Sequence, residues 1–382
     1  MKIDPYKHKE HFLEWKEKVK NGIPSLSAYN SDLVKRYVSD MEMGINVAGS
    51  SKKGSRSYPR LNTLRHRLIF LAKLFKERFD IDKITDISEE QLFNVFSDMR
   101  NGNFLGKRNK KYTSVRDYVK DFKAFWHWYQ KINRKEGKHL IDITLDLDTS
   151  KEKPKWVYLS EEQIKILCNK AKYEYRVLIM FLFDSGIRAP TELVNIRVSD
   201  FSNDFKDLCI RDEISKTFGR KIKLMLCSDF VKEYVKVKKL SVDDAVFKLS
   251  PSVTNRYLKR LALKVFGSSK SLAGELYSNL TLYDFRHNSC CYWLPRYQQE
   301  AGLKYRFGWK NSDKIHYYSE MLGMKDNITE EDLFIDTSKT EIEQRLEKSE
   351  KERSLLQEKV GLMEKQMEKI LEMTNQLLEK VG

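Results

Sequence analysis

Apolar residues recur at helical spacing along most of the chain, with polar residues between them. In the first part, this pattern predicts helices over residues 1–22, 25–43, 59–79, 88–99 and 114–134. Two Ser-Glu-Glu-Gln sequences, at Ser88 and Ser160, match a capping box and mark positions where helices begin. No strand pattern interrupts the first region, so we expect an all-helical N-terminal domain there.

A second region combines helices with a short β-ribbon. Helical spacing recurs over residues 160–173, 174–183, 228–237, 252–266, 283–294 and 312–321. Residues 207–211 and 221–226 alternate or run apolar, and they flank a polar turn at 215–220, which is typical of a hairpin. The predicted fold class is therefore mainly α with a small β-ribbon.

The last segment has a different period. From Ile342 onward, apolar residues are spaced alternately four and three apart, with mostly Glu and Lys between them. This heptad pattern predicts a C-terminal coiled coil. The expected organisation is a helical domain (1–145), a polar linker (146–156), a mixed α/β domain (157–336) and the coiled coil (337–382).

Composition indicates a globular protein with an anionic partner. Of 382 residues, 41% are hydrophobic and 33% charged, and the formal net charge is +16. Such an excess favours nucleic acid first and a membrane surface second. The sequence has no apolar run long enough to span a bilayer and no secretory signal, so we expect a cytoplasmic protein without a membrane partner.

The sequence predicts no metal or cofactor. Its five cysteines form no Cys-x-x-Cys pair, which favours free thiols in a reducing compartment over a zinc site. It also lacks a carboxylate cluster, a His-x-x-x-His motif and a Gly-rich phosphate loop ending in Gly-Lys-Ser/Thr.

Basic residues recur in the N-terminal region and beside the predicted ribbon. A solvated helix face is the ordinary interpretation of one such patch, but repetition in a strongly basic chain favours phosphate contacts. The candidate DNA-contacting residues are Arg60, Arg65, Arg67, Lys107, Arg108, Lys110, Lys111, Arg220 and Lys221.

Two arginines in apolar surroundings, Arg188 and Arg286, lie on either side of the basic hairpin. Guanidinium groups match phosphate oxygens in pairs, and a tyrosine hydroxyl can attack phosphorus. The alternative for both arginines is a buried ion pair, for example with Asp184 or Asp284, because an unpaired buried arginine is unfavourable.

The order Arg, Lys, Tyr-x-x-Arg, Gly-Trp, Tyr resembles the tyrosine recombinase (phage-type integrase) family. The first motif resembles residues 184–188 (DSGIR), the second 282–287 (LYDFRH), and Gly308-Trp309 is followed nine residues later by Tyr318. The resemblance covers about half of the chain, from near Trp156 to near Ser319. A tyrosine in the usual histidine position of the second motif is similar to integrases of archaeal plasmids and viruses.

The resemblance implies a role for each matching residue. Tyr318 would be the nucleophile, with adjacent Tyr317 as its rival, and the hairpin lysine, Lys216, would protonate the leaving 5′ oxygen. Arg220 and Lys221 are alternatives to that lysine or plain phosphate contacts. The implied catalytic residues are Arg188, Lys216, Tyr283, Arg286, Trp309 and Tyr318.

Two departures from the family pattern accompany this assignment. Tyr283 replaces the usual histidine, whereas Trp309 occupies a position that holds histidine or tryptophan in the family. Both can donate hydrogen bonds, through O–H and N–H, but neither can perform the acid–base chemistry of an imidazole near neutral pH. Glu192 lies four residues after Arg188, where the family has three, so its role stays open.

The resemblance implies a site-specific recombinase or integrase that cleaves and rejoins double-stranded DNA through a 3′-phosphotyrosyl intermediate. Two domains would clamp the duplex, and a tetramer would assemble on two sites. The implied location is the nucleoid of a prokaryotic cell, with a viral or plasmid gene as a possible source. The coiled coil would support self-association or bind a partner helix. The alternatives are a non-catalytic architectural DNA-binding protein, or type IB topoisomerase or hairpin-forming resolvase activity.

Overall fold

A computed structural model describes residues 2–45, 54–106, 109–150, 154–297, 299–322 and 349. The chain divides into two compact units, residues 1–315 and 316–382. The larger unit has two separate hydrophobic cores, one from residues between 12 and 147 and one from residues between 157 and 285. The predicted coiled coil lies outside the described residues, apart from the single residue 349.

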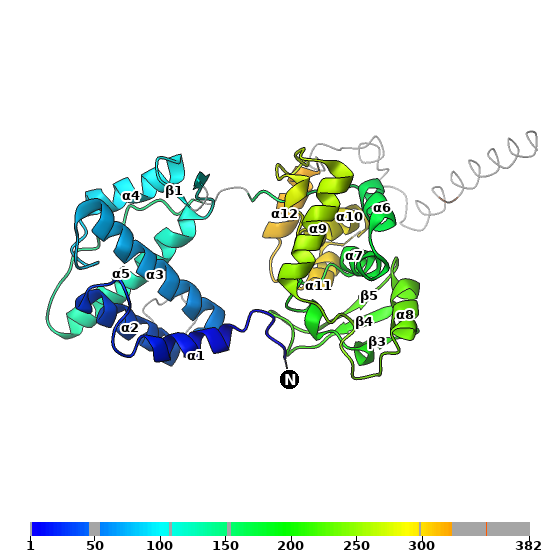
Figure 1. Cartoon of the computed structure of the whole chain (residues 1–382), viewed down its shortest axis with the longest axis horizontal. Helices are drawn as coiled ribbons and strands as arrows, with labels where there is room; N and C mark the ends of the chain where they lie inside the picture. The colour runs from blue at the N-terminus through cyan, green and yellow to red at the C-terminus, as the bar shows by residue number, and fades with distance from the viewer. Residues whose placement is uncertain are drawn as a thin grey trace, which may run out of the picture. The chain divides into compact units, whose positions relative to one another are not determined.

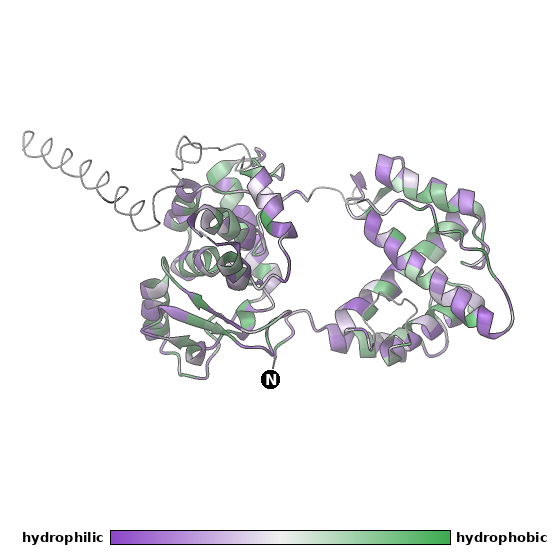
Figure 2. Cartoon of the chain, turned by 180° about the vertical axis from the view of Figure 1, so that it is seen from behind, coloured by the Kyte–Doolittle hydropathy of each residue, from purple (hydrophilic) through white to green (hydrophobic). Residues whose placement is uncertain are grey.

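The first core is enclosed by helices (Figure 1). These are α1 (His8–Lys18), α2 (Ala28–Met43), α3 (Tyr58–Phe79), α4 (Glu89–Asn101) and α5 (Val115–Lys135). The two longest, α3 and α5, bury aromatic side chains against each other, and the Phe75 and Phe122 ring centroids are 5.8 Å apart. Hydrophobic and hydrophilic residues alternate along these helices, as the spacing predicts (Figure 2).

A small hairpin interrupts this helical region. Strands β1 (Leu105–Gly106) and β2 (Lys110–Lys111) pair antiparallel between α4 and α5. The expectation of an all-helical region is therefore wrong in this detail. Each strand has only two residues, which is too short to show the two-residue period by which a strand is recognised.

The second core combines helices with a three-stranded sheet of order β3-β4-β5. The strands are β3 (Phe201–Ser202), β4 (Asp207–Ile210) and β5 (Arg220–Lys223). The helices are α6 (Glu161–Lys170), α7 (Tyr173–Ser185), α8 (Ser228–Val237), α9 (Pro251–Phe266), α10 (Asp284–Trp293) and α11 (Glu300–Phe307), with short 3-10 turns η2 (Leu193–Asn195), η3 (Val198–Asp200), η4 (Tyr277–Asn279) and η5 (Leu294–Arg296). Helix α12 (Asp313–Met321) follows. This arrangement confirms the predicted mainly α class with a small β-ribbon.

Local sequence explains where these elements begin and end. Ser160 Oγ accepts a hydrogen bond from the Gln163 amide at 3.2 Å, and the Gln163 side chain accepts one from the Ser160 amide at 3.0 Å, so the predicted capping box forms. Ser88 and Gln91 make the same pair of contacts. Helix α7 ends at Ser185. The next residue, Gly186, has a φ of +61°, which favours glycine, and Arg188 follows in the predicted turn.

Candidate active site

Arg188 lies in the turn after α7 and is held by hydrogen bonds to Glu192, Gly308 and Thr217. Its amide donates to Glu192 Oε2 at 2.8 Å, and its Nη1 donates to Glu192 Oε1 at 2.8 Å. Its Nη2 donates to the Gly308 carbonyl at 2.8 Å. The side chain is 14% exposed, so most of its surface is covered by the protein.

Glu192, four residues after Arg188, binds two arginines. Its buried carboxylate also accepts hydrogen bonds from Arg220, at 2.8 Å from Nη2 and 3.2 Å from Nη1. Burial alone would raise the pKa of this carboxyl, but the hydrogen bonds and charges of Arg220 and Arg188 lower it below its ordinary value. An ionised Glu192 therefore fixes the orientation of Arg188.

Arg286, on α10, is 5% exposed and donates only to backbone carbonyls among its described partners. Its Nη1 lies 2.6 Å from the Gly186 oxygen and its Nη2 lies 2.5 Å from the Phe307 oxygen. Burial, followed by the positive charge of Arg188, lowers its pKa to about 10. A buried cation held by neutral acceptors favours an anionic ligand.

Neither arginine pairs with Asp184 or Asp284, but the alternative of an ion pair holds for Arg188, whose Nη1 lies 2.8 Å from the buried Glu192 carboxylate. Asp184 pairs instead with Arg306 at 3.0 Å and accepts three backbone hydrogen bonds from residues 225–227. Asp284 accepts hydrogen bonds from the Thr281 side chain and from the Val157 amide. Within the described ranges, no carboxylate lies at ion-pair distance from Arg286.

Three arginines donate hydrogen bonds to backbone carbonyls at the C-terminal end of α11. Three successive carbonyls, those of residues 306, 307 and 308, accept hydrogen bonds from Arg220, Arg286 and Arg188 respectively. The carbonyl end of a helix carries partial negative charge, which stabilises cations there. One helix end therefore aligns both predicted phosphate-binding arginines.

Lys216 is exposed in the loop between β4 and β5. The neighbouring Thr217 brings this loop to the arginines, because its hydroxyl donates to the Gly308 carbonyl at 2.9 Å. Lys221 is also exposed, and its amine pairs with Asp207 at 3.1 Å.

Tyr283 and Trp309 each pack near the α10 turn that carries Arg286. Tyr283 is 49% exposed at the start of α10, and its ring lies edge-on to His287 with centroids 5.2 Å apart. The Trp309 ring stacks on Phe307 at 4.9 Å, and the Arg286 guanidinium lies 5.8 Å from the Trp309 centroid. Trp309 therefore lies beside Arg286, and Tyr283 lies beside the next residue of α10, His287.

The His287 side chain packs against an aromatic ring and is held in its neutral form. Its ring stacks on Trp156 with centroids 4.8 Å apart. Burial lowers its pKa to about 3, with the charges of Lys314 and Arg286 acting in the same direction. The imidazole is therefore neutral at physiological pH, which agrees with a role in helix packing.

The predicted nucleophile lies on α12. Tyr318 is 3% exposed and Tyr317 is half-buried, and their ring centroids are 5.1 Å apart. Residues from 316 onward belong to the second unit.

The basic residues expected to contact DNA fall into different classes. Arg65 is 7% exposed, donates to Asn62 at 2.8 Å and lies over the Trp15 ring. Arg220 is buried, and its donors are used by Glu192 and by the Arg306 carbonyl. Arg65 and Arg220 therefore direct their donors to neighbouring protein groups, and a direct contact of either with DNA stays a prediction.

The remaining candidates keep exposed surface to different degrees. Arg60 and Arg67 share the buried carboxylate of Asp121, which neutralises part of their charge. Lys110 and Lys111 are exposed on β2, and no carboxylate of the described chain forms an ion pair with either amine. Lys107 and Arg108 lie outside the described residues.

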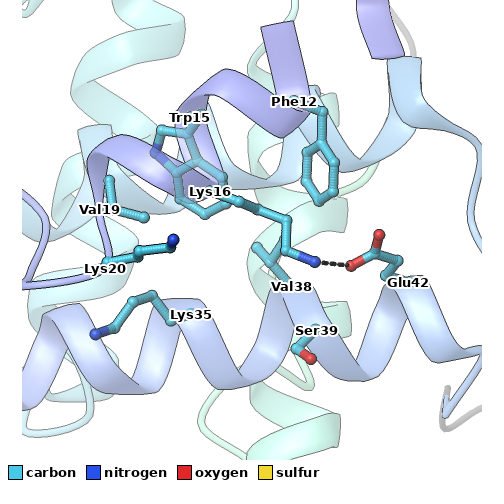
Figure 3. A pocket seen from close by; sticks show the side chains of 9 residues that line it. All are labelled: Phe12, Trp15, Lys16, Val19, Lys20, Lys35, Val38, Ser39 and Glu42. Atoms are coloured by element: carbon cyan, nitrogen blue, oxygen red, sulfur yellow. Dashed lines mark hydrogen bonds and ion pairs between the residues drawn. The ribbon is translucent and has the colours of Figure 1, made fainter. Parts of the chain in front are cut away.

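A pocket of about 180 Å³ lies between α1 and α2 (Figure 3). It is lined by Phe12, Trp15, Lys16, Val19, Lys20, Lys35, Val38, Ser39 and Glu42. Each lysine amine pairs with a carboxylate: Lys16 with Glu42 at 2.9 Å, Lys20 with Glu17 at 2.5 Å and Lys35 with Asp32 at 3.0 Å. Its rim is therefore largely neutral, and the pocket shares no residue with the candidate active site.

The described residues contain neither a candidate metal-binding group nor a membrane-spanning helix. No group of three His, Cys, Asp or Glu side chains lies close enough to hold a metal ion. No described helix has the length and apolar character needed to cross a membrane. The five cysteines are all free, and four of them are buried.

Comparison with known proteins extends the sequence resemblance. No protein-family profile matches the chain. The chain is 29% identical over 114 residues to a probable integrase/recombinase of Aquifex aeolicus (strain VF5), a match that covers 26% of this chain. It spans only 35% of the length of that relative.

Solved structures give the wider fold match. A lambda integrase dimer bound to a COC′ core site has a TM-score of 0.57 at 14% identity, covering 83% of this chain and 82% of that one. The Tn1549 transposon integrase in complex with a circular intermediate DNA has a TM-score of 0.55 at 15% identity, covering 78% and 99%. A lambda integrase tetramer bound to a Holliday junction has a TM-score of 0.56 at 13% identity, covering 80% of each chain. The chain therefore has the fold of the tyrosine recombinases, the family that its motifs resemble.

Proposed function

We propose that this chain is a site-specific DNA recombinase or integrase that cleaves and rejoins DNA through a 3′-phosphotyrosyl intermediate. The observation that carries the proposal is the alignment of Arg188 and Arg286 on successive carbonyls at the end of α11. Arg286 in particular is a buried cation whose described hydrogen-bond acceptors are carbonyl oxygens, which suits a phosphodiester.

In the proposed reaction, the Tyr318 oxygen attacks the scissile phosphorus and gives its proton to a water molecule. The new P–O bond to tyrosine replaces the P–O5′ bond, and Lys216 supplies a proton to the leaving 5′ oxygen. Arg188 and Arg286 bind the non-bridging oxygens and stabilise the charge of the transition state. Rejoining is the same exchange in reverse, with the 5′ hydroxyl as nucleophile.

Tyr283 and Trp309 would add hydrogen bonds to the phosphate. A phenol O–H and an indole N–H are both donors, and both rings lie beside Arg286 or its neighbour His287. Because His287 is neutral, it carries no extra proton to give to the leaving oxygen. Lys216 is therefore the proposed general acid.

A nicked suicide substrate tests the proposal. The duplex carries the sequence that the protein selects from a pool of random duplexes, with a nick that lets the short product diffuse away. We expect wild type to form a covalent protein–DNA band that Tyr318→Phe abolishes and Tyr317→Phe retains. Loss in Tyr317→Phe alone would assign the nucleophile to that residue. No band with wild type on a bound site would refute cleavage and favour a non-catalytic DNA-binding protein.

Residues 1–145 and 157–336 are the two domains that we propose to clamp the duplex. We also propose assembly into a tetramer on DNA, supported by the fold match to a lambda integrase tetramer bound to a Holliday junction. The heptad segment 337–382 would strengthen self-association. Removal of this segment should lower the number of protomers measured by light scattering, and an unchanged number would argue against that role.

A further inference from the structure

Thr217 connects the loop of Lys216 to Arg188. Its Oγ1 donates to the Gly308 carbonyl at 2.9 Å, and the same oxygen lies 3.4 Å from Arg188 Nη2. Arg188 Nη2 also donates to that carbonyl, at 2.8 Å. A hydroxyl, a guanidinium and a carbonyl therefore form a closed triangle next to the proposed acid.

Other contacts hold the two ends of this loop but do not reach Arg188. The Gly219 amide donates to Asp212 Oδ1 at 2.6 Å, and the Lys221 amide donates to the Tyr305 hydroxyl at 3.1 Å. The Phe218 ring stacks near Tyr305, with centroids 6.1 Å apart. In the described part of the loop between β4 and β5, Thr217 is the residue whose side chain contacts the Arg188 guanidinium.

We infer that Thr217 is a positioning residue that fixes Lys216 relative to the phosphate held by Arg188. This inference rests on the proposed role of Lys216 as general acid. Proton transfer needs the donor within about 2.6–3.2 Å of the leaving oxygen, so a small shift of the loop would weaken it. Because Lys216 directly precedes Thr217, release of the Thr217 hydroxyl frees the backbone that carries the lysine.

The test compares two leaving groups. Thr217→Val removes the hydroxyl at nearly constant volume, whereas Thr217→Ser keeps it. Each variant is assayed on an ordinary nicked duplex and on one with sulfur in place of the 5′ bridging oxygen. A thiolate leaves without protonation, since the pKa of a thiol is only about 8.5, so the sulfur substrate does not need the acid.

We expect Thr217→Val to cleave the ordinary substrate on the order of 10–100-fold more slowly than wild type, the scale of a misplaced general acid. On the sulfur substrate its rate should approach that of wild type. Thr217→Ser should resemble wild type on both. If Thr217→Val does not fold, as judged by urea unfolding, Thr217→Ala removes the same hydroxyl without adding a methyl group.

Several outcomes would overturn the inference. An equal loss on both substrates would mean that Thr217 acts through Arg188 or through general structure. No loss on either substrate would mean that the hydroxyl is dispensable. Lys216→Ala tests the role of Lys216 separately from that of Thr217. If the sulfur substrate restores cleavage by Lys216→Ala but not by Thr217→Val, only the positioning role of Thr217 fails. If sulfur rescues neither variant, Lys216 is not the acid and both statements fail.

Discussion

Glu192 Oε2 lies 2.8 Å from Arg220 Nη2, inside the protein, and the same carboxylate holds Arg188. This relationship links the sheet to the active site. Arg220 opens β5, where its register partner is Ile210 on β4, and alternation along the strand turns its side chain inward with that of Ile222. The buried Glu192–Arg220 pair therefore holds the turn that carries Arg188 in a fixed place against the sheet.

Replacing Glu192 with glutamine should impair both stability and cleavage. Removing one charge of a buried ion pair leaves the other uncompensated, which typically destabilises by about 3–5 kcal/mol. We expect the loss toward the lower end, because glutamine keeps one acceptor oxygen. Urea unfolding measures the free energy, and covalent-complex formation measures cleavage by the folded variant.

Glu213→Gln is the matched control for this charge removal. Glu213 also pairs with an arginine, Arg211, but its side chain is 57% exposed. Exposed ion pairs contribute about 0–1 kcal/mol, so this variant should be close to wild type. Equal stabilities of the two variants would contradict the structural role of the buried carboxylate.

Gly186→Ala should lower the free energy of unfolding more than Gly137→Ala, although both glycines have a positive φ. At Gly186, φ is +61°, and an added Cβ would collide with the Phe307 ring and lie 2.7 Å from Ser289 Oγ. Gly137 has φ of +77° and nothing within 4 Å of an added Cβ, so it isolates the backbone effect. We expect Gly186→Ala to unfold more easily than Gly137→Ala by about 1–3 kcal/mol, the range for overpacking.

Urea unfolding of the two glycine variants measures this difference. Gly186→Ala should also slow cleavage, since the carbonyl of residue 186 accepts from Arg286. Equal stability of the two alanine variants would show that the residues around Gly186 can move aside freely.

Sequence patterns predicted the elements whose signals are local. The Ser160 capping box and the α10 helix before Pro295 depend on near neighbours, and both form. The burial of Arg65 depends on packing against Trp15, which is distant in sequence, so a basic-residue count could not reveal it.

In the candidate active site, too, local motifs were predictable from the sequence, whereas contacts between distant residues were not. Motif order identified Arg188 and Arg286, which the fold brings to one helix end. The end of helix α11 and the hydrogen bond from Thr217 to the Gly308 carbonyl could not be predicted, because carbonyl acceptors leave no side-chain signature in the sequence. The alternation of Arg220, Lys221 and Ile222 is a signal that would have predicted an inward Arg220.

His287 should make the protein less stable as the pH falls below neutrality. Its pKa is lowered to about 3 in the folded state, against about 6.5 for an ordinary histidine. Below about 6.5 the unfolded chain gains a proton that the folded chain does not, so unfolding becomes more favourable. From pH 7 to pH 5 this contribution amounts to about 1–2 kcal/mol.

The comparison of His287→Gln with wild type isolates this contribution. We expect the pH 7 to pH 5 decrease in unfolding free energy, measured by urea titration, to be smaller in His287→Gln. His139→Gln is the control, because His139 is exposed and its replacement leaves the buried imidazole in place. A wild-type pH dependence in His287→Gln would mean that this imidazole is not held neutral.

The hairpin lysines should control the salt dependence of DNA binding. Lys110 and Lys111 are exposed on β2, and within the described residues neither amine forms an ion pair. Each phosphate contact contributes about one unit to the slope of log K against log salt. We expect Lys110→Ala with Lys111→Ala to lower this slope by up to about two units and to weaken binding equally on different sequences.

Lys76→Ala provides the control for loss of an exposed lysine. Lys76 already pairs with Asp80 at 2.7 Å and Asp82 at 2.9 Å, so its charge is largely neutralised by the protein. Its replacement should leave the salt slope unchanged in a fluorescence anisotropy titration. A slope that is unchanged in the Lys110 and Lys111 variant as well would exclude phosphate contacts at β2. DNA binding would then have to come from other basic groups such as Lys221, whose side chain is 59% exposed.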